Sequence, residues 1–481
     1  MRKAKIIGVC FLAFFVAAFM LAPAVQSEQE FKVTFEELEK HKALLDDPRP
    51  VFKNLSYKKI IPAEVYAKVT YDIEAMKKLW AEVIGFKSPD VVGKIAPEIK
   101  PGTYTYKDKE KYSGFKKLMI PDHYARFKPG APPHVGNFPE IEVIPTRQYY
   151  WALPIAEATR RNMGRTQLDD QGYILPDTYT AGFPFPRPSG KFRAQQIMYN
   201  WEKRYFGGEN QFFLMQQRGV TKNFKVDFAG ASEMSILRLH GRTMLEPYGC
   251  YDERARIRGE HRDLMMHMLA PRDLYGNVMG TLTYLDRNKF DRFFMYISAL
   301  RRIRKLSATD TQDRLGGQDY IYDDQENFAQ KLNPERYPYK YDVIAEREYL
   351  VPAPQIDGAG YLSSKGMEFR NCRFERRSIW VVKLTQMDKT YVFSYRILYF
   401  DKETFQLYLV QNYDQKGRLY VSTGQIFMGF IPEMGLFVSM GGLARDHLDL
   451  HSTYVRHFVI PVATWLGRDD FNLRSLIAGS K

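Results

Sequence analysis

The strongest constraint on the fold is a change in the residue pattern at Gln211. After this position, short apolar runs alternate with turn residues. The runs are rich in Phe, Tyr, Val, Leu and Met, and their spacing is typical of β-hairpins. One set of predicted strands lies at 264–269, 278–285, 293–297 and 303–306, and a second at 378–384, 391–399, 406–411 and 419–425. The second half of the chain therefore predicts an antiparallel meander.

The connections between these strands carry turn chemistry. Asp286, Asp401 and Asp414 each begin one connection. An aspartate favours a turn because its side chain accepts hydrogen bonds from nearby backbone N–H groups. Gly417 can adopt the positive φ that a bulged hairpin needs.

Several predicted strands have no polar face. The segments "LMMHML" (264–269) and "FFMYI" (293–297) are apolar at successive positions, whereas a sheet with one wet side alternates apolar and polar residues. Both faces must therefore be covered. Two arrangements meet this need: a strongly curved sheet with helices or a ligand in its hollow, or an ordinary two-layer core.

The region before the strands is of a different kind. Thr34 and Glu37 form a capping-box pattern, and apolar spacing predicts helices at 71–83, 152–162 and 192–204. Seven prolines lie from Pro121 to Pro154, which predicts an extended linker or an arm that wraps a neighbour. We divide the chain into a signal segment at 1–27, a helical and Pro-rich segment at 28–150, and a β-sheet domain at 151–481.

The first residues have the pattern of a secretory signal peptide. Arg2, Lys3 and Lys5 precede an apolar run at 6–21, and small residues then allow cleavage after Ala24 or Ser27. The run has 16 residues, fewer than the ~20 of a spanning helix, although an uncleaved anchor is the alternative. No later apolar stretch reaches that length. We expect a mature periplasmic protein without a stable membrane span.

The net charge limits the kinds of binding partner, and the cysteine content limits the number of disulfides. The net charge is +14, and the predicted signal carries three of these charges. Export argues against a nucleic-acid partner, so the basic residues predict a solvated surface or, alternatively, attraction to anionic lipid head groups. Cys250 and Cys372 remain after cleavage; an oxidising compartment allows one disulfide between them, and two free buried thiols are the alternative.

Two groups of segments resemble known families. "DRFFMYISALRRIRKL" (291–306) and "QDYIYDD" (318–324) resemble parts of outer-membrane lipoprotein-sorting proteins. "AGFPFPRPSG" (181–190), the arginine run at 301–304 and "ILYFDKETFQLYLVQNYDQKGRLY" (397–420) resemble one exported bacterial family of unknown function. This resemblance covers residues 144–454.

The resemblance implies a fold like that of the lipoprotein carriers LolA and LolB. Such a fold is mainly β (α+β), with a strongly curved antiparallel half-barrel sheet and helices on its concave side. It implies an acyl chain or another lipophilic group as ligand. It also implies an efflux-type inner-membrane transporter as partner.

Candidate cavity residues follow from composition. Aromatic and Met side chains suit a lipophilic hollow because Met adapts to irregular shapes, and each of them is alternatively plain core. The candidates are Trp201, Phe213, Met266, Met268, Phe294 and Trp380. Arg302 and Arg304 share one face of a predicted strand, where they either grip a phosphate or carboxylate at the cavity rim or form a solvated strand end.

His447 and His451 in "RDHLDLH" (445–451) are the candidate metal ligands. On a helix, this spacing would place both imidazoles on one face. The surroundings predict strand and loop instead, where residues four apart lie too far from each other to share an ion. We therefore predict no metal, no cofactor and no catalytic residue.

Three functions are compatible with the sequence. The first is a non-enzymatic periplasmic carrier of a lipid or other lipophilic molecule, with a dry pocket. The second is a structural or adaptor subunit of an envelope transport complex, with a filled core and a large apolar patch. The third is a secreted hydrolase that uses a metal at His447 and His451.

Overall fold

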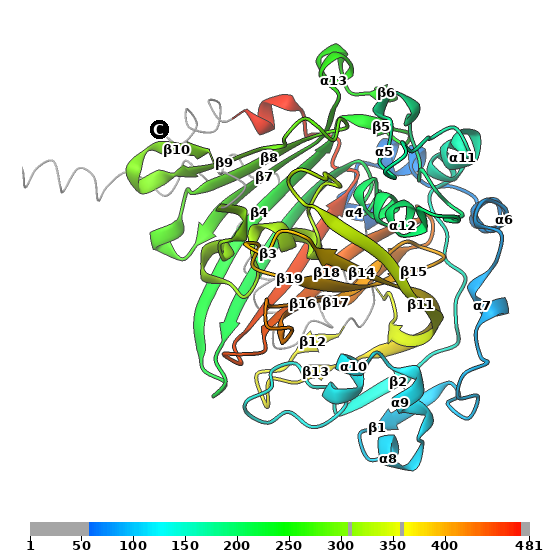
Figure 1. Cartoon of the computed structure of the whole chain (residues 1–481), viewed down its shortest axis with the longest axis vertical. Helices are drawn as coiled ribbons and strands as arrows, with labels where there is room; N and C mark the ends of the chain where they lie inside the picture. Colours follow the sequence, from blue (N-terminus) through cyan, green and yellow to red (C-terminus); the bar gives the residue numbers. More distant parts are fainter. Residues whose placement is uncertain (1–56, 306–309, 356–359, 473–481) are drawn as a thin grey trace, which may run out of the picture.

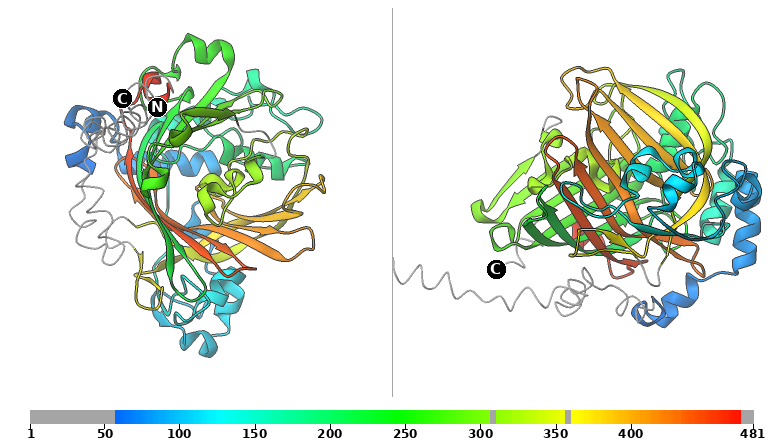
Figure 2. Two further views of the ribbon diagram at one scale, coloured as in Figure 1. Left: turned by 90° about the vertical axis from the view of Figure 1, so that its left-hand side faces the viewer. Right: turned by 90° about the horizontal axis from the view of Figure 1, so that it is seen from below.

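The computed structural model describes residues 57–305, 310–355 and 360–472. Its dominant element is a sheet of 15 strands, which curves strongly around a hollow (Figures 1 and 2). The predicted signal segment at 1–27 and the capping pair Thr34 and Glu37 lie outside the described residues.

Two antiparallel meanders build the sheet. The first consists of β3 (Asn210–Val220), β4 (Val226–Arg238), β7 (Glu260–Ala270), β8 (Val278–Tyr284), β9 (Arg292–Ile297) and β10 (Arg302–Lys305). The second consists of β14 (Arg373–Gln386), β15 (Tyr395–Asp401), β16 (Leu407–Tyr413), β17 (Leu419–Ile431), β18 (Leu436–Asp446) and β19 (Ser452–Pro461). Because β19 pairs antiparallel with β3, the two meanders form one sheet.

The sheet has two edges. Among the described strands, β10 pairs only with β9, and β11 (Tyr339–Pro352) pairs only with β14. An isolated parallel bridge joins Leu350 of β11 to Met119. Near the β14 edge, β1 (Gly102–Thr105) pairs with β2 (Glu140–Val143), which joins the start of β14 in parallel. The small pairs β5 (His240–Arg242) with β6 (Gly249–Cys250) and β12 (Tyr361–Leu362) with β13 (Phe369–Arg370) stand apart. This open, curved antiparallel sheet confirms the predicted half-barrel.

Strands that are apolar at successive positions are buried on both faces. On β7, Met266 belongs to the main core in the hollow, whereas Met265 packs on the opposite face with Val278. Leu466 and Phe471, which follow β19, cover part of that convex face. Burial of each Met contributes about 1.5–3 kcal/mol, so both faces of β7 stabilise the sheet.

The predicted turns are confirmed. The side chains of Asp286, Asp401 and Asp414 accept hydrogen bonds from backbone N–H groups two or three residues ahead, and Gly417 has a φ of 75°. Several strand bounds differ from the prediction: β14 begins at Arg373 and not at 378, β17 ends at Ile431 and not at 425, and β15 begins at Tyr395 and not at Tyr391. Tyr391 lies before the strand, and its hydroxyl donates to the buried carboxylate of Asp323.

The α-helices of the described chain are short. They are α4 (Tyr57–Ile60), α5 (Ala63–Lys68), α6 (Ile73–Ile84), α7 (Ser88–Val91), α8 (Asp108–Lys111), α9 (Gly114–Leu118), α10 (Pro121–Arg126), α11 (Leu153–Asn162), α12 (Arg193–Glu202) and α13 (Glu253–Arg258). Three of them, α6, α11 and α12, match the predicted helices. Asp72 caps α6 by accepting from the N–H of Ala75, and Gly85 ends it with a φ of 89°. Within the described ranges no helix is long and apolar enough to cross a membrane.

Residues 310–338, called here the crossing segment, connect the two edges of the sheet. The chain leaves β10 at one edge and enters β11 at the other, so it must cross the sheet. It contains the 3₁₀ turns η4 (Asp310–Gln312), η5 (Leu315–Gly317) and η6 (Tyr322–Asn327). It lies over the hollow beside α12 (Figure 2). Trp201 Nε1 of α12 donates to the carbonyl of Phe328 at 2.8 Å. The predicted helix on the concave side is therefore present in α12, and an irregular segment completes the cover.

The Pro-rich stretch is an arm that packs on the chain's own sheet. Its strand β2 pairs with β14, and the rings of Phe138 and Phe374 lie 5.4 Å apart. Upstream of the arm, Trp80 of α6 is fully buried and donates to the carbonyl of Glu403. Residues on both sides of position 150 thus contribute to one hydrophobic core.

Cys250 and Cys372 are both free thiols. Cys372 is buried, whereas Cys250 is half-buried in strand β6, where it pairs with His240 of β5. Of the two open possibilities, the structure has the unbonded one.

A cavity between the sheet and the crossing segment

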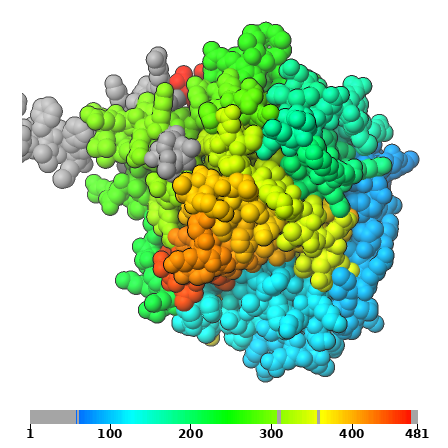
Figure 3. Space-filling model, viewed as in Figure 1, coloured from blue at the N-terminus to red at the C-terminus, as the bar shows by residue number. Residues whose placement is uncertain are grey.

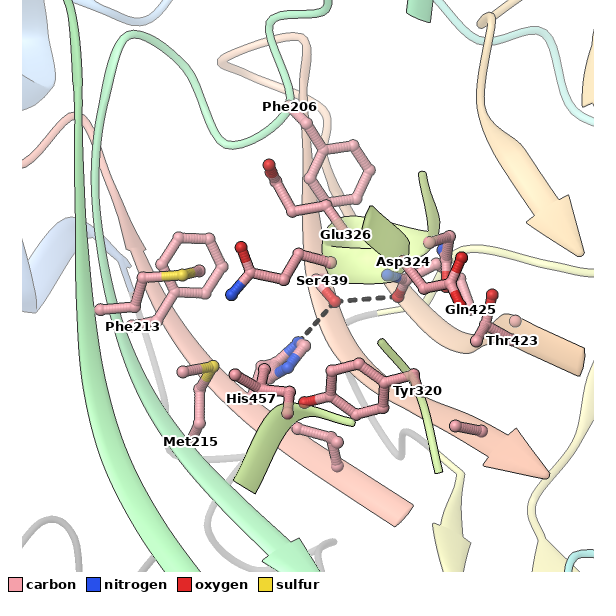
Figure 4. A pocket seen from close by; sticks show the side chains of 18 of the residues that line it. Phe206, Phe213, Met215, Tyr320, Asp324, Glu326, Thr423, Gln425, Ser439 and His457 are labelled. Carbon is pink, nitrogen blue, oxygen red and sulfur yellow. Dashed lines mark hydrogen bonds between the residues drawn. The ribbon is translucent and has the colours of Figure 1, made fainter. Parts of the chain in front are cut away.

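A cavity of about 120 Å³ lies in the hollow of the sheet (Figure 4). Its wall comes from β3, β4, β7, β17, β18 and β19 on the sheet side, and from α12 and the crossing segment on the other. Figure 3 shows the covered face: the yellow-green crossing segment lies between the green first meander and the orange β15–β16 region.

Apolar side chains make most of the wall. On each strand, alternate residues point into the hollow because successive side chains of a strand face opposite sides. The apolar residues are Trp201, Phe206, Phe213, Met215, Met234, Leu264, Met266, Leu315, Leu443, Ala444 and Val455. Such a wall favours an apolar ligand because contact with it removes apolar surface from water.

Three neighbouring strands place a polar row in this wall. The Oγ of Ser439 donates to Gln425 Oε1 at 2.8 Å and lies 2.6 Å from His457 Nδ1 (Figure 4). Burial lowers the pKa of His457 to about 4, so the ring is neutral. Ser439 Oγ thus bridges Gln425 of β17 and His457 of β19, and the three side chains form one hydrogen-bonded row.

A cluster of charges borders the cavity. Glu326 of the crossing segment binds Arg204 at 2.6 Å and Arg262 at 3.1 Å. Burial opposes ionisation of Glu326, but the two guanidinium groups outweigh it and lower the pKa to about 2. Glu326 is thus an anion that fastens the crossing segment to the end of α12 and to β7.

A second ion pair anchors the same segment. Asp324 pairs with Arg396 of β15, and the side chains of both residues are fully buried. Asn412 lies 2.9 Å from Arg396 and also contacts Asp324. The next carboxylate, Asp323, accepts from the hydroxyls of Tyr337 and Tyr391. Charges inside the hollow are therefore matched by partners, as burial requires.

The structure brings three of the sequence-predicted residues to the cavity. Trp201, Phe213 and Met266 line it. Met268 lies two residues beyond Met266 and packs against the same core, without lining the cavity. Trp380 is also in this core, where its ring stacks on Phe405 at 6.3 Å.

The other three predicted residues lie elsewhere, contrary to expectation. Phe294 packs with the convex-side cluster because its ring covers Gly280 on that face. Arg302 and Arg304 are exposed on the edge strand β10, outside the walls of the described cavities. Their strand belongs to the sheet edge, and not to a rim around the hollow.

His447 and His451 point to different partners. His447 Nε2 lies 2.8 Å from Ser422 Oγ, whereas His451 contacts Asp319 at 2.6 Å and Asp227 at 3.1 Å. Burial lowers the pKa of His447 to about 4. The hydrogen bond to Asp319 raises the pKa of His451 to about 9. Across the described ranges, no three His, Cys, Asp or Glu side chains form a group that could hold a metal ion.

Sequence reasoning missed several cavity residues. Met215 and Gln217 lie on the same face of β3 as Phe213, and the period of two along a strand could have found them. Ser439 and His457 are close because β18 and β19 are neighbours, a pairing that local sequence does not carry.

The comparisons with known proteins place the chain in a family. Residues 116–452 match a family described as protein of unknown function, DUF1329. The chain belongs to this family. DUF1329 coverage begins within α9 and ends at the start of β19, so it includes the arm, the crossing segment and most of the sheet.

One curated relative matches a large part of the chain. The uncharacterized protein PA3922 of Pseudomonas aeruginosa is 23% identical over 323 residues, which are 64% of this chain. The match spans 65% of that protein's length.

Solved structures give looser similarities. An outer membrane lipoprotein-sorting protein domain from Vibrio parahaemolyticus has a TM-score of 0.41 at 15% identity, over 58% of this chain and 97% of the other. A DUF1329 family protein from Desulfovibrio piger scores 0.40 at 13% identity, over 56% and 91%. The LolA superfamily protein NE2245 from Nitrosomonas europaea scores 0.36 at 13% identity, over 58% and 98%. Because these TM-scores are low, the assignment of a curved half-barrel fold rests on the observed sheet and not on these similarities.

Proposed function

We propose that this protein binds a lipophilic molecule in the hollow of its sheet and acts as a carrier. The observation that supports this most directly is the cavity, whose wall is apolar over most of its surface and which lies between the sheet and an irregular covering segment. Binding sites for small molecules are generally concave, mostly apolar, and fitted with a few polar groups. Gln425, Ser439 and His457 are such groups here.

The size of the cavity limits how much of a ligand it can hold. At about 120 Å³ it is close to engineered cavities of ~150 Å³ that bind benzene, so it holds one small apolar group. A second cavity shares Arg204, Leu264, Gln325 and Glu326 with the first, and lies between β7–β8 and the crossing segment. A longer chain would extend along this direction when the crossing segment moves outward.

The cellular setting belongs to the same proposal. The signal-like N-terminus supports export to the periplasm, where a carrier would exchange its ligand with an inner-membrane transporter. A carrier needs no catalytic group, and Ser439 and His457 can serve it as part of a hydrogen-bonded row in the cavity wall. An adaptor role would require a filled hollow, which the cavity disfavours.

The test uses two adjacent methionines on opposite faces of β7. Met266 lines the cavity, whereas Met265 is buried on the convex face. Replacement by Gln keeps the volume and adds a polar amide, so Met266→Gln should lower the affinity for the neutral fluorescent probe N-phenyl-1-naphthylamine about 10-fold. Met265→Gln should leave it within two-fold, although both variants lose stability.

Fluorescence titration of folded protein measures both affinities. Lack of probe binding by the wild type, or equal losses in the two variants, would contradict the proposed carrier function.

A further inference from the structure

Three buried polar atoms of the cavity wall have no hydrogen-bond partner among the residues that the structure describes. They are Gln217 Oε1, Thr423 Oγ1 and Asn327 Nδ2, and all three side chains line the cavity. The residues are only 2%, 4% and 8% exposed. They come from β3, β17 and η6, so the sheet and the crossing segment both present one.

These atoms are costly in an empty apolar wall. A buried donor or acceptor without a hydrogen bond opposes folding, and most buried polar groups in proteins are paired. Replacement by apolar side chains of the same shape would remove that cost. Their presence therefore points to a bound molecule that supplies the missing hydrogen bonds.

The charged atoms of the wall differ from them. Glu326 is bonded to Arg204 and Arg262, and Asp324 is bonded to Arg396. An anionic head group would have to compete with Glu326 for these guanidinium groups, and a cationic one would compete with them for the carboxylates. The wall therefore offers a ligand uncharged hydrogen-bonding groups. They are the amides of Gln217 and Asn327, the hydroxyl of Thr423 and the neutral ring of His457.

We propose that the ligand is an uncharged amphiphile, with an apolar body and a hydroxyl, ester or amide group that hydrogen-bonds to Gln217, Thr423 or Asn327. This inference rests on the proposed carrier function and narrows it, because it excludes fatty acids and phospholipid head groups from the cavity. Both donors and acceptors are offered, so a hydroxyl, which needs one of each, fits best.

Three amphiphiles with the same ten-carbon chain test whether a neutral, an anionic or a cationic head group binds best. Displacement of N-phenyl-1-naphthylamine from the wild-type protein at pH 7.5 should need at least 10-fold less 1-decanol than decanoate or decylammonium. Decanoate or decylammonium displacing the probe as well as decanol would overturn the inference. If the probe itself does not bind, the carrier function fails and the inference fails with it.

Two variants test the polar atoms. Thr423→Val has the shape of threonine without its hydroxyl, and should weaken the binding of decanol about 5- to 10-fold more than it weakens the binding of the probe. Gln217→Met, which keeps the side-chain length, should act in the same direction and provides the test if Thr423→Val does not fold. The control is Thr385→Val on β14, a half-buried threonine outside the cavity wall, which should change neither affinity. Unchanged decanol affinity in both cavity variants would refute the role of these atoms, with the carrier function intact if the probe still binds.

Discussion

Asp324 and Arg396 show how a charged segment can lie inside an apolar hollow. Their side chains are fully buried and bonded to each other, and Asn412 bonds to both. The attraction between the two charges is strong where water is excluded, and it offsets the loss of hydration only while both partners are present. The pair therefore fixes the position of η6 against β15.

Removal of the arginine should expose this dependence. Arg396→Met leaves a carboxylate buried without its counter-ion, so the free energy of unfolding should fall by about 3–5 kcal/mol. The matched change Arg302→Met, on the exposed edge strand, should alter it by no more than about 0.5 kcal/mol. Urea unfolding of both variants measures the difference. Equal stabilities would show that Asp324 is not held as described.

At the residue scale, sequence reasoning found only part of the cavity. Trp201, Phe213 and Met266 were predicted because large apolar side chains on a strand or helix favour burial. Phe294 has the same character and lies on the other face, because position within an all-apolar strand does not reveal which face is concave. Adjacent acids such as Asp323 and Asp324 suggest a surface, and their burial depends on Tyr391 and Arg396, which are distant in sequence.

The crossing segment is the element on which the cavity depends. Besides the pairs at Asp324 and Glu326, it is fixed near its start by Asp319, which is fully buried and contacts His451 at 2.6 Å and Thr453 at 2.7 Å. His451 also reaches Asp227 beside the β3–β4 turn. One imidazole thus joins the crossing segment, β19 and the first meander.

This histidine should make stability depend on pH. Its pKa is raised from 6.5 to about 9 by the hydrogen bond to Asp319, so the folded state holds the proton more tightly than the unfolded one. The stabilisation is fully present below pH 6.5 and is lost as pH rises to about 9. Allowing for screening by solvent, it amounts to roughly 1–2 kcal/mol.

The comparison with His451→Gln isolates this contribution. The difference in unfolding free energy between wild type and variant should shrink between pH 6.5 and 9, as measured by urea titrations across that range. A difference that is constant with pH would show that the imidazole does not carry the charge.

At the element scale, local patterns predicted well and long-range placement predicted poorly. Strands β7, β8 and β9 followed from short apolar runs between turn residues. Helices α6, α11 and α12 followed from apolar spacing, because that spacing records which side of a helix is buried. The crossing segment has no such period. Its course follows from the positions of β10 and β11 at opposite edges, which local sequence does not specify.

The whole molecule is one curved sheet with a cover on each side. The second meander follows the first in sequence, yet β19 returns to pair with β3, and the arm before residue 150 packs on β14. The resemblance to a lipoprotein-carrier fold predicted the curvature and the covered concave side. It did not predict that the cover is mostly an irregular segment held by ion pairs. Those pairs link the segment to Arg262 of the first meander and to Arg396 of the second, which are far from it in sequence.

The central claim is that the hollow binds a neutral amphiphile, and its most direct test is to locate one. Crystals of the mature protein grown with 10-bromo-1-decanol allow the bromine to be found by its anomalous scattering. We predict one strong bromine peak among Phe213, Met215 and Met266, with the hydroxyl end close to Thr423 or Gln217. Peaks confined to the convex face or the outer surface, with the hollow unchanged, would contradict the account.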